Sequence, residues 1–595
     1  MTTIRSARVR ARARIATRAS AIVAACCLLI SAVPHRPAGP EFAAFVDRYL
    51  DAFARRHPSI AAGNGIHDHD DLLEDFSAAG VRQEVADLKR MRSELRGFDA
   101  AKLSADERVD QKILDGIIDG WLLEQETLEN WKRNPMLYAS ALADGVHNLM
   151  TMENAPAPVR MRRVIAKLHE LPRLLAAAEA NITKPPKLFA QRGVIMMRGA
   201  SSMLGGDLRL AFAEAGTPAL RDSLWKAAEA SRPLIDAYAA WLEKEVVPKA
   251  TGDFTIGAVA LSRRYHAEEL IDTPIDRMVR IGERELKASQ AAFRAAAARI
   301  DPRRAALDVW HDAWKDHPAM GQVIPSTQRI VDSLTAFVRA RNLATVPANE
   351  RVIVAQSQPF NIGAASMHAS PPLEPVPVKS FYYVNEPRGG QSPEQDEAAL
   401  QRHNKYSVTI TSAHEAMPGH WLHSVFMRRT PGKIRRIWIG LNPFPQPSSG
   451  QDGWAHYAEQ LIADQGYAGG DPRYVMAQQS DALMRICRLL AGIRVHTKQW
   501  TLEQAQACFE KEAFLAPPAA QREAERSSYD PTYGGYFLGK RGFLKLRKDY
   551  EAKQQQAGQA FDLKAFHERV MSNGIAPLWA HRALLLPGDR SAIID

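Results

Sequence analysis

Between about Glu41 and Val346 the sequence repeats apolar side chains with the period of an α-helix. Four segments show the pattern most clearly: Asp106–Lys132, Pro218–Lys249, Pro274–Ile300 and Thr327–Leu343. Apolar residues recur there at i, i+3, i+4 and i+7, which places them on one face of a helix. The tryptophans of this part follow the same spacing, so we interpret them as helix packing. The pattern predicts a mainly α-helical protein.

The length allows more than one hydrophobic core. The chain has 595 residues, of which 46% are hydrophobic and 24% are charged, as in ordinary globular proteins. Beyond an N-terminal segment at 1–38, we expect a helical scaffold lobe at 39–346 and a second lobe at 347–595. We expect the two lobes to flank a cleft and to form one unit.

The second lobe contains short segments typical of strands. Arg351–Gln356, Phe381–Val384 and Tyr406–Thr411 are rich in β-branched and aromatic residues. A proline-rich loop, Pro371–Pro377, lies among them. We expect a small sheet whose last strand leads directly to His414. Its edge would either bind an extended peptide as an added strand or serve only as a structural hairpin.

The N-terminus predicts export. Six of the first eighteen residues are arginine, and an apolar stretch at Ala19–Val33 follows them. We expect a signal peptide cleaved between Ala32 and Gly39 and a periplasmic or secreted protein. Val23–Cys26 also fits a lipoprotein cleavage site, so attachment to a membrane depends on lipidation at Cys26. A mitochondrial presequence is a further alternative.

The remaining chain predicts a soluble protein that does not bind nucleic acid. No later stretch of eighteen residues is apolar throughout. The net charge of +10 falls to +4 without the six N-terminal arginines (10 − 6 = 4), which is too small and too dispersed for a nucleic-acid surface.

Two cysteines and four histidines do not indicate a metal or catalytic site. We interpret Cys487 and Cys508 as buried small residues, not as a metal site, although export would permit a disulfide. Four histidines stand alone in the helical part and are interpreted as surface or satisfied core residues: His147, His169, His266 and His311.

The strongest functional signal is the segment from His414 to His420, His-Glu-Ala-Met-Pro-Gly-His. In the common zinc motif H-E-x-x-H the second histidine lies one helical turn after the first, whereas here Pro418 takes that position. On a regular helix His420 would point about 120° away from His414. Pro418 and Gly419 therefore have to kink or widen the helix to bring the two histidines together.

A second polar cluster follows about thirty residues later. Asp452, His456 and Glu459 stand at i, i+4 and i+7, so they share one face of a predicted helix. Either this face is solvated, or a cation lies opposite it. A divalent metal bound by two histidines would lack one carboxylate ligand, which Asp452 or Glu459 would provide.

These two motifs resemble the bacterial family called domain of unknown function 885. The resembling segments are His414–His420, Gly453–Glu459, Tyr536–Gly539, and Phe561–His567 with Asn573–Leu578. Asp452 stands where the family usually has Glu, and Trp421 stands where it usually has a second histidine. The family is similar at a distance to the zinc peptidases related to thimet oligopeptidase and angiotensin-converting enzyme. The resemblance thus implies a helical, often exported, zinc-dependent peptidase with a large, two-lobed fold similar to that of helical metallopeptidases.

The resemblance also implies roles for individual residues. One Zn²⁺ per chain would bind His414, His420 and a carboxylate, with Asp452 favoured and Glu459 as the alternative or as the partner of a ligating histidine. Glu415 would act as general base. Tyr536 and His456 would donate hydrogen bonds to the oxyanion, and Lys540 or Arg541 would bind a substrate carboxylate. Simple packing remains an alternative for Tyr536, and solvated charge for Lys540 and Arg541.

The function expected from these observations is the cleavage of short peptides by a metal-activated water. Two alternatives stay open. The same residues would serve a metal-dependent amidase or esterase on non-peptide substrates. A catalytically inactive helical binding protein would keep the fold, and the departures at Asp452 and Trp421 are compatible with that alternative.

Overall fold

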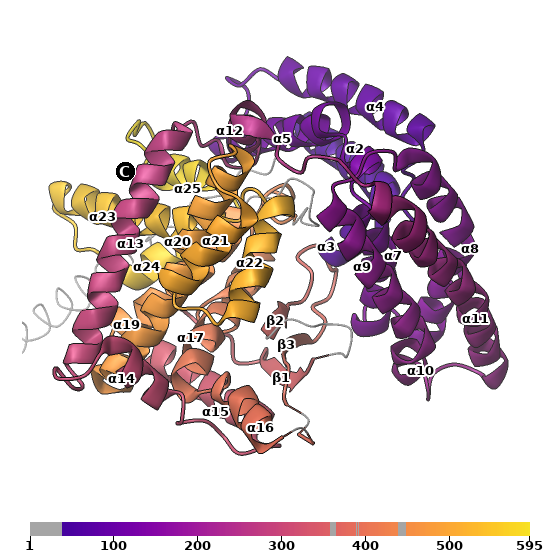
Figure 1. Cartoon of the computed structure of the whole chain (residues 1–595). Helices are drawn as coiled ribbons and strands as arrows, with labels where there is room; N and C mark the ends of the chain where they lie inside the picture. Colours follow the sequence, from indigo (N-terminus) through magenta and orange to yellow (C-terminus); the bar gives the residue numbers. More distant parts are fainter. Residues whose placement is uncertain (1–38, 358–364, 388, 391, 438–447, 595) are drawn as a thin grey trace, which may run out of the picture.

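The computed structural model describes residues 39–357, 365–387, 389–390, 392–437 and 448–594. The expected signal peptide at 1–38, including Cys26, lies outside this range. The described part is mainly α-helical with one small sheet, as predicted (Figure 1). Its helices include none that is both long and apolar enough to cross a membrane.

The first group of helices surrounds its own hydrophobic core. The group comprises α2 (Pro40–Arg56), α3 (Pro58–Asn64), α4 (Ala78–Gly97), α5 (Ala105–Leu122), η1 (Leu123–Leu128), α6 (Asn130–Arg133), α7 (Met136–Thr151), α8 (Ala157–Asn181), α9 (Lys187–Gly205), α10 (Asp207–Ala211), α11 (Pro218–Trp241), η2 (Leu242–Val246) and η3 (Val247–Lys249). Buried apolar residues from Phe42 to Val246 form the core, together with Ile434, Ile437, Ala576 and Ala580 from later in the chain.

The second group surrounds another core, built from residues between Leu261 and Ile594. It comprises α12 (Gly257–Glu269), α13 (Ile275–Ala298), α14 (Ala306–Ala313), α15 (Val323–Ala340), α16 (Pro393–Gln401), α17 (Lys405–Glu415), α18 (His420–Met427), α19 (Ser448–Asp464), η4 (Tyr467–Gly470), α20 (Pro472–His496), α21 (Leu502–Lys511), α22 (Pro517–Tyr529), α23 (Gly535–Gln556), α24 (Leu563–Ser572) and α25 (Leu578–Leu585). The division of the chain into lobes at residue 346 stays a prediction.

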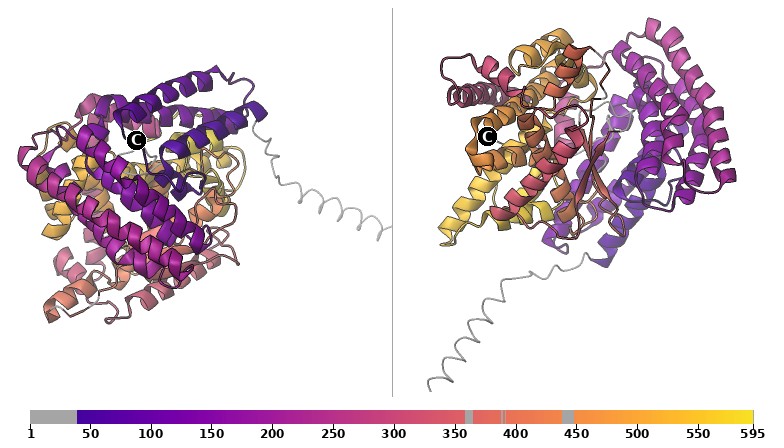
Figure 2. Two further views of the ribbon diagram at one scale, coloured as in Figure 1. Left: turned by 90° about the vertical axis from the view of Figure 1, so that its right-hand side faces the viewer. Right: turned by 90° about the horizontal axis from the view of Figure 1, so that it is seen from below.

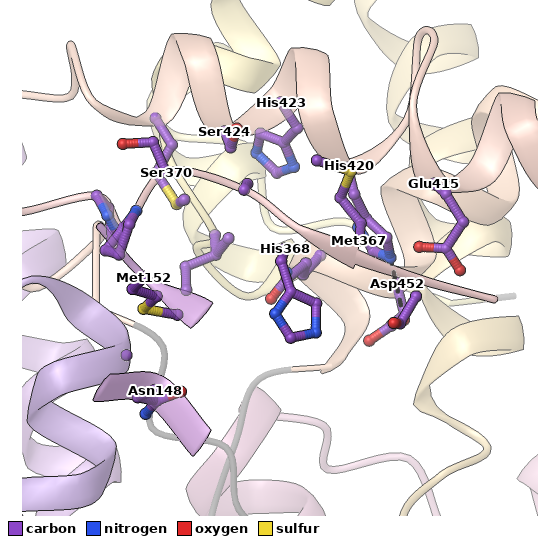
Figure 3. A pocket seen from close by; sticks show the side chains of 18 of the residues that line it. Asn148, Met152, Met367, His368, Ser370, Glu415, His420, His423, Ser424 and Asp452 are labelled. Carbon is purple, nitrogen blue, oxygen red and sulfur yellow. Dashed lines mark ion pairs between the residues drawn. The ribbon is translucent and has the colours of Figure 1, made fainter. Parts of the chain in front are cut away.

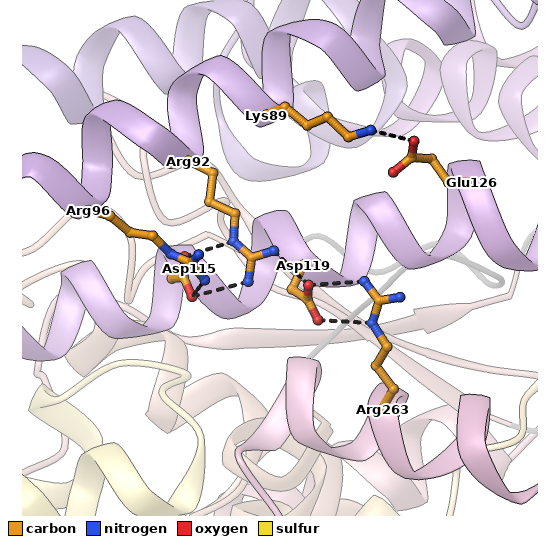
Figure 4. A network of polar contacts seen from close by, with 7 residues as sticks. All are labelled: Lys89, Arg92, Arg96, Asp115, Asp119, Glu126 and Arg263. Atoms are coloured by element: carbon orange, nitrogen blue, oxygen red, sulfur yellow. Dashed lines mark hydrogen bonds and ion pairs between the residues drawn. The ribbon is translucent and has the colours of Figure 1, made fainter.

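Ion pairs on the surface connect the two groups of helices. Arg92 of α4 contacts Asp115 and Asp119 of α5 at 2.9 and 2.7 Å. Asp119 also contacts Arg263 of α12 at 3.1 Å (Figure 4). Since α12 contributes to the second core, this network joins the scaffold helices to the helices of the other group.

A three-stranded sheet lies between the two groups (Figures 1 and 2). Its strands are β1 (Val352–Gln356), β2 (Ala365–His368) and β3 (Ser380–Val384), in the order β1-β3-β2. β3 pairs with β1 in parallel and with β2 antiparallel, and Ala365 lies opposite Val384. The predictions for β1 and β3 are confirmed. β2, an edge strand that packs against α17, was not predicted.

The predicted strand at Tyr406–Thr411 is wrong, because these residues belong to α17. Asn404 caps this helix by accepting a hydrogen bond from the Ser407 N–H. Tyr406, Ile410 and Ala413, at i, i+4 and i+7, are all buried. The β-branched residues therefore concealed a helical apolar face, and its burial outweighs their preference for strands.

Candidate metal centre

The segment between the two histidines ends one helix and begins another. α17 ends at Glu415 and α18 begins at His420, with Gly419 as its N-cap residue. A Cβ atom at position 419 would lie only 1.8 Å from the His414 carbonyl oxygen, so only glycine fits there. The indole N–H of Trp454 donates to the Pro418 carbonyl at 3.1 Å and so links this turn to α19. The predicted interruption of the helix is thus a complete break.

Three side chains present possible ligand atoms to one point. Nε2 of His414 and Nε2 of His420 lie 3.9 and 3.5 Å from Oδ1 of Asp452. The ligand atoms of all three residues lie within 4.8 Å of one another. Ligands about 2.0–2.1 Å from a tetrahedral zinc are separated by roughly 3.3 Å. The three residues therefore fit a zinc ion with small movements of their side chains.

Glu459 lies behind His414, on the side away from that point. Its carboxylate accepts a hydrogen bond from Nδ1 of His414 at 2.7 Å, which leaves Nε2 available for a metal. It also pairs with Arg485 at 2.8 Å and with Nδ1 of His456 at 2.9 Å. Of the two carboxylates that the sequence left open, the structure thus brings Asp452 to the ligand atoms and places Glu459 as the partner of a histidine.

The electrostatic surroundings of His414 and Glu459 suit a cation at this centre. At His420, burial is outweighed by Asp452, which raises the pKa of that imidazole. Burial lowers the pKa of His414 well below its usual value, and His420 and Arg485 lower it further, so His414 is a neutral imidazole. Burial opposes ionisation of Glu459, but Arg485 and His456 outweigh it and lower the pKa of that carboxyl. A neutral imidazole held by an ionised carboxylate is a common arrangement around zinc.

A cavity of about 550 Å³ opens beside the centre, between the two groups of helices. Glu415, His420 and Asp452 line one part of it (Figure 3). α3 and α7 of the scaffold line the opposite part, and β2 with the loop after it lies between them. Its volume is typical of cavities that bind small ligands. An edge strand, a scaffold wall and the candidate metal centre therefore meet at one cavity.

Glu415 is the carboxylate placed for proton transfer. A backbone hydrogen bond from Met367 of β2 reaches its carboxylate, and burial raises its pKa above the usual value. The side chain lines the cavity and is not among the three residues that present ligand atoms. A carboxylate with a raised pKa next to a metal centre is suited to accept a proton and release it again.

Tyr536, in the first turn of α23, also lines the cavity. Arg526 donates to its hydroxyl at 3.4 Å, and the guanidinium groups of Arg488 and Arg526 lie over its ring. Burial and the nearby Asp452 raise its pKa, so the hydroxyl keeps its proton and can donate it in a hydrogen bond.

Three other predicted site residues do not reach the cavity. His456 is fully buried and hydrogen-bonds Glu459. Lys540 is 7% exposed, and burial lowers its pKa to about 8 against the opposing effect of Glu459. Arg541 pairs with Glu285 at 3.1 Å. In these positions the geometry does not support an oxyanion donor at His456 or substrate binding by Lys540 and Arg541, and both assignments stay predictions. The helical period places Arg541 on another face of α23 than Tyr536, whereas Lys540, at i+4, shares the face of Tyr536 but lies one turn further along the helix, near Glu459.

The cavity also contains residues that the sequence analysis missed. Asp144, His147 and Asn148 of α7 line it, as do His368 and His423. We had assigned His147 to the surface or a satisfied core, and its position in the cavity wall corrects that interpretation. The spacing of Asp144, His147 and Asn148 at i, i+3 and i+4 places three polar side chains on one helical face, a signal that was present in the sequence.

Comparison with known proteins identifies the family. Residues 58–583 match the model of a family described as bacterial protein of unknown function, DUF885. The chain belongs to the DUF885 family. No curated protein matches it in sequence.

Two solved structures share the fold of this DUF885 protein. One is a candidate lipoprotein of unknown function from Shewanella oneidensis, which is 24% identical, with a TM-score of 0.75, over 92% of this chain and 99% of that protein. The other is a candidate lipoprotein from Colwellia psychrerythraea, which is 16% identical, with a TM-score of 0.76, over 92% of this chain and 98% of that protein.

Proposed function

We propose that this DUF885 protein is an exported zinc-dependent hydrolase that cleaves peptide bonds in short peptides. The observation that carries the proposal is the meeting of His414, His420 and Asp452 at one point in the wall of a cavity, with Glu415 beside them. Two neutral imidazoles with one carboxylate are a usual ligand set of hydrolytic zinc sites. The names of the two solved relatives, both candidate lipoproteins, support export.

His414, His420 and Asp452 would hold the ion, with Glu459 and Arg485 fixing the orientation of His414. A bound zinc supplies a Lewis acid that polarises the scissile carbonyl and acidifies water. Glu415 accepts the proton of the attacking water and passes it to the leaving amine nitrogen, for which its raised pKa is suited. The Tyr536 hydroxyl donates a hydrogen bond to the carbonyl oxygen as negative charge develops there.

β2 supports a peptide as the substrate. It is an edge strand of the sheet, and all four of its residues line the cavity. Backbone groups at such an edge can pair with an extended peptide. Such pairing would hold the peptide next to Glu415, to which Met367 of the same strand is hydrogen-bonded.

The first experiment measures zinc by mass spectrometry in the purified protein and in His420→Ala and Glu415→Gln variants, followed by incubation with a peptide library. We expect about one zinc per chain in the wild type and in Glu415→Gln, and loss of zinc in His420→Ala. Peptide cleavage should fall by about 10²–10⁴-fold in Glu415→Gln, because the general base is removed while the ligands stay.

Two results would contradict the proposal. One is a wild-type protein that takes up no zinc from solution, which would leave a helical binding protein. The other is full activity of Glu415→Gln. Turnover of acyl esters without turnover of any peptide would replace the peptidase with an esterase that uses the same residues.

A further inference from the structure

In the part of the cavity that the structure describes, acidic side chains are not balanced by lysine or arginine. Three carboxylates line it, those of Asp144, Glu415 and Asp452, and no described lining residue is Lys or Arg. Two nearby arginines lie behind the wall and have partners there: Arg485 pairs with Glu459, and Arg526 pairs with Asp530. Asp452 would bind a metal ion, and Glu415 accepts a backbone hydrogen bond, so each of these two carboxylates has a partner.

Asp144 is the carboxylate that remains. It lies on α7 of the scaffold, and within the described part of the chain no hydrogen bond or ion pair reaches its side chain. Burial raises its pKa to about 7, and the neighbouring Glu74 adds to the shift. Such a shift is typical of a carboxylate that is removed from water without a counter-ion.

The histidines next to Asp144 do not supply that positive charge. His147 lies one turn further along α7, and its ring contacts the ring of His368 in β2, with 5.5 Å between centroids. Burial lowers the pKa of His147 to about 3 and that of His368 to about 4, so both are neutral at pH 7. The scaffold wall thus presents one carboxylate and neutral polar groups to the cavity.

β2 connects this wall to the candidate metal centre. Met367 contacts Glu415, and the next residue, His368, contacts His147. Figure 3 shows Asn148 and Met152 of α7 on one side of His368, with Glu415 and Asp452 on the other. Asp144 precedes Asn148 by one helical turn, so both lie on the same face of α7. A short extended peptide along β2 would reach from one wall to the other.

We propose that Asp144 binds a cationic nitrogen of the substrate, so that the enzyme cleaves short peptides with a free amino terminus in preference to blocked ones. The inference rests on the proposed function and adds the substrate class. A carboxylate that is partly buried and has no partner binds an ammonium group through charge-assisted hydrogen bonds. The described lining offers no Lys or Arg to a substrate carboxylate, which disfavours recognition of the carboxyl terminus.

The test compares kcat/KM for Ala-Ala-Phe, N-acetyl-Ala-Ala-Phe and N-acetyl-Lys-Ala-Phe with wild-type enzyme and with Asp144→Asn. We expect the wild type to prefer the free amine over the acetylated peptide by about 10- to 100-fold, chiefly through KM. In Asp144→Asn this preference should fall to near one. If the lysine peptide is preferred instead of the free amine, the cation is a side chain and the amino-terminal assignment is overturned.

Binding to the zinc-loaded Glu415→Gln variant separates this inference from the proposed function. Titration calorimetry with Ala-Ala-Phe should show tighter binding than with its acetylated form, and Asp144→Asn added to Glu415→Gln should remove the difference. Asp51→Asn, which changes an exposed carboxylate on α2, is the matched control and should keep it. Equal binding of the two peptides by the Glu415→Gln variant would overturn the assignment of Asp144, whether or not the enzyme cleaves peptides.

Discussion

Two networks of charged residues in this protein differ mainly in their burial. The network of α4, α5 and α12 in Figure 4 lies near the surface: the side chains of Arg96 and Arg263 are 60% and 41% exposed, and those of Arg92 and Asp119 keep 21% and 15%. The network around Glu459 is buried, since Glu459 is 0% and Arg485 8% exposed. Water and salt weaken the attraction between the charges of the first network far more than between those of the second.

The comparison shows that similar ion pairs serve different purposes. Exposed pairs contribute about 0–1 kcal/mol each, and those of Figure 4 add a small amount to the contact between the two groups of helices. The buried network has a high cost of desolvation, which its mutual contacts offset only when every partner is present. Its value lies in holding His414 in one orientation at the candidate metal centre.

The largest effect on stability is expected when Glu459, at the centre of the buried network, loses its charge. Glu459→Gln removes the nearer counter-ion of the buried Arg485, leaving Asp481 at 3.8 Å, and weakens the hydrogen bond to His414. We expect the free energy of unfolding of the metal-free protein to fall by about 3–5 kcal/mol. Zinc affinity should fall by about 10- to 100-fold. Denaturant unfolding and zinc titration measure the two effects.

The control for this variant is Asp464→Asn, which removes an exposed carboxylate from the same helix. It should change the free energy of unfolding by no more than about 0.5 kcal/mol. Equal losses in the two variants would show that the buried and exposed charges do not differ as we describe.

A smaller effect is expected at Lys540, at the edge of the buried network. Burial lowers its pKa to about 8, whereas an unfolded lysine releases its proton near 10.4. Between these values the unfolded chain binds more protons than the folded one, so Lys540 makes stability rise with pH, by at most about 1.4 kcal/mol per pH unit. Lys540→Met should make the slope shallower by up to that amount between pH 8 and 10.

Unfolding by denaturant at several pH values measures this slope in the metal-free protein. The exposed Lys548 of the same helix provides the matched control, because Lys548→Met should leave the slope as in the wild type. An unchanged slope in Lys540→Met would mean that water solvates Lys540 well enough to keep an ordinary pKa.

The smallest effect belongs to the surface network. Asp119 pairs with Arg92 at 2.7 Å and with Arg263 at 3.1 Å and is the link between α5 and α12. Asp119→Asn should lower the free energy of unfolding by about 1 kcal/mol or less, and the loss should shrink in 1 M salt. A loss as large as that of Glu459→Gln would remove the distinction between the two networks.

The sequence predicted the centre of the site better than its surroundings. His414, Glu415, His420 and Asp452 stand close together in two short motifs, and helical spacing places Asp452 and Glu459 on one face. The walls of the cavity could not be found in the same way. Asp144 and His368 lie far from these motifs in the chain and reach the cavity only through the packing of α7 and β2.

Long helices were also predicted better than short helices and strands. Long helices with a regular apolar period, such as Pro274–Ile300, correspond to observed helices, here α13. The short segment Tyr406–Thr411 is rich in β-branched residues, which favour a strand, and it is too short to show a helical period clearly. In the structure it belongs to α17 and buries one helical face. β2 lacks a strand pattern, since it consists of Ala365, Ser366, Met367 and His368 and forms by pairing with β3.

The sequence alone determined the helical fold and the ligand types of the candidate metal centre, because both depend on residues that are only a few positions apart. Only the tertiary structure shows how differently Asp452 and Glu459 are placed. Both share a face of α19, but Asp452 lies at the cavity with the two Nε2 atoms, whereas Glu459 lies deeper, against Arg485 and Nδ1 of His414. Depth in the packed helices therefore leaves Asp452 open to the cavity and pairs Glu459 with a guanidinium of the protein.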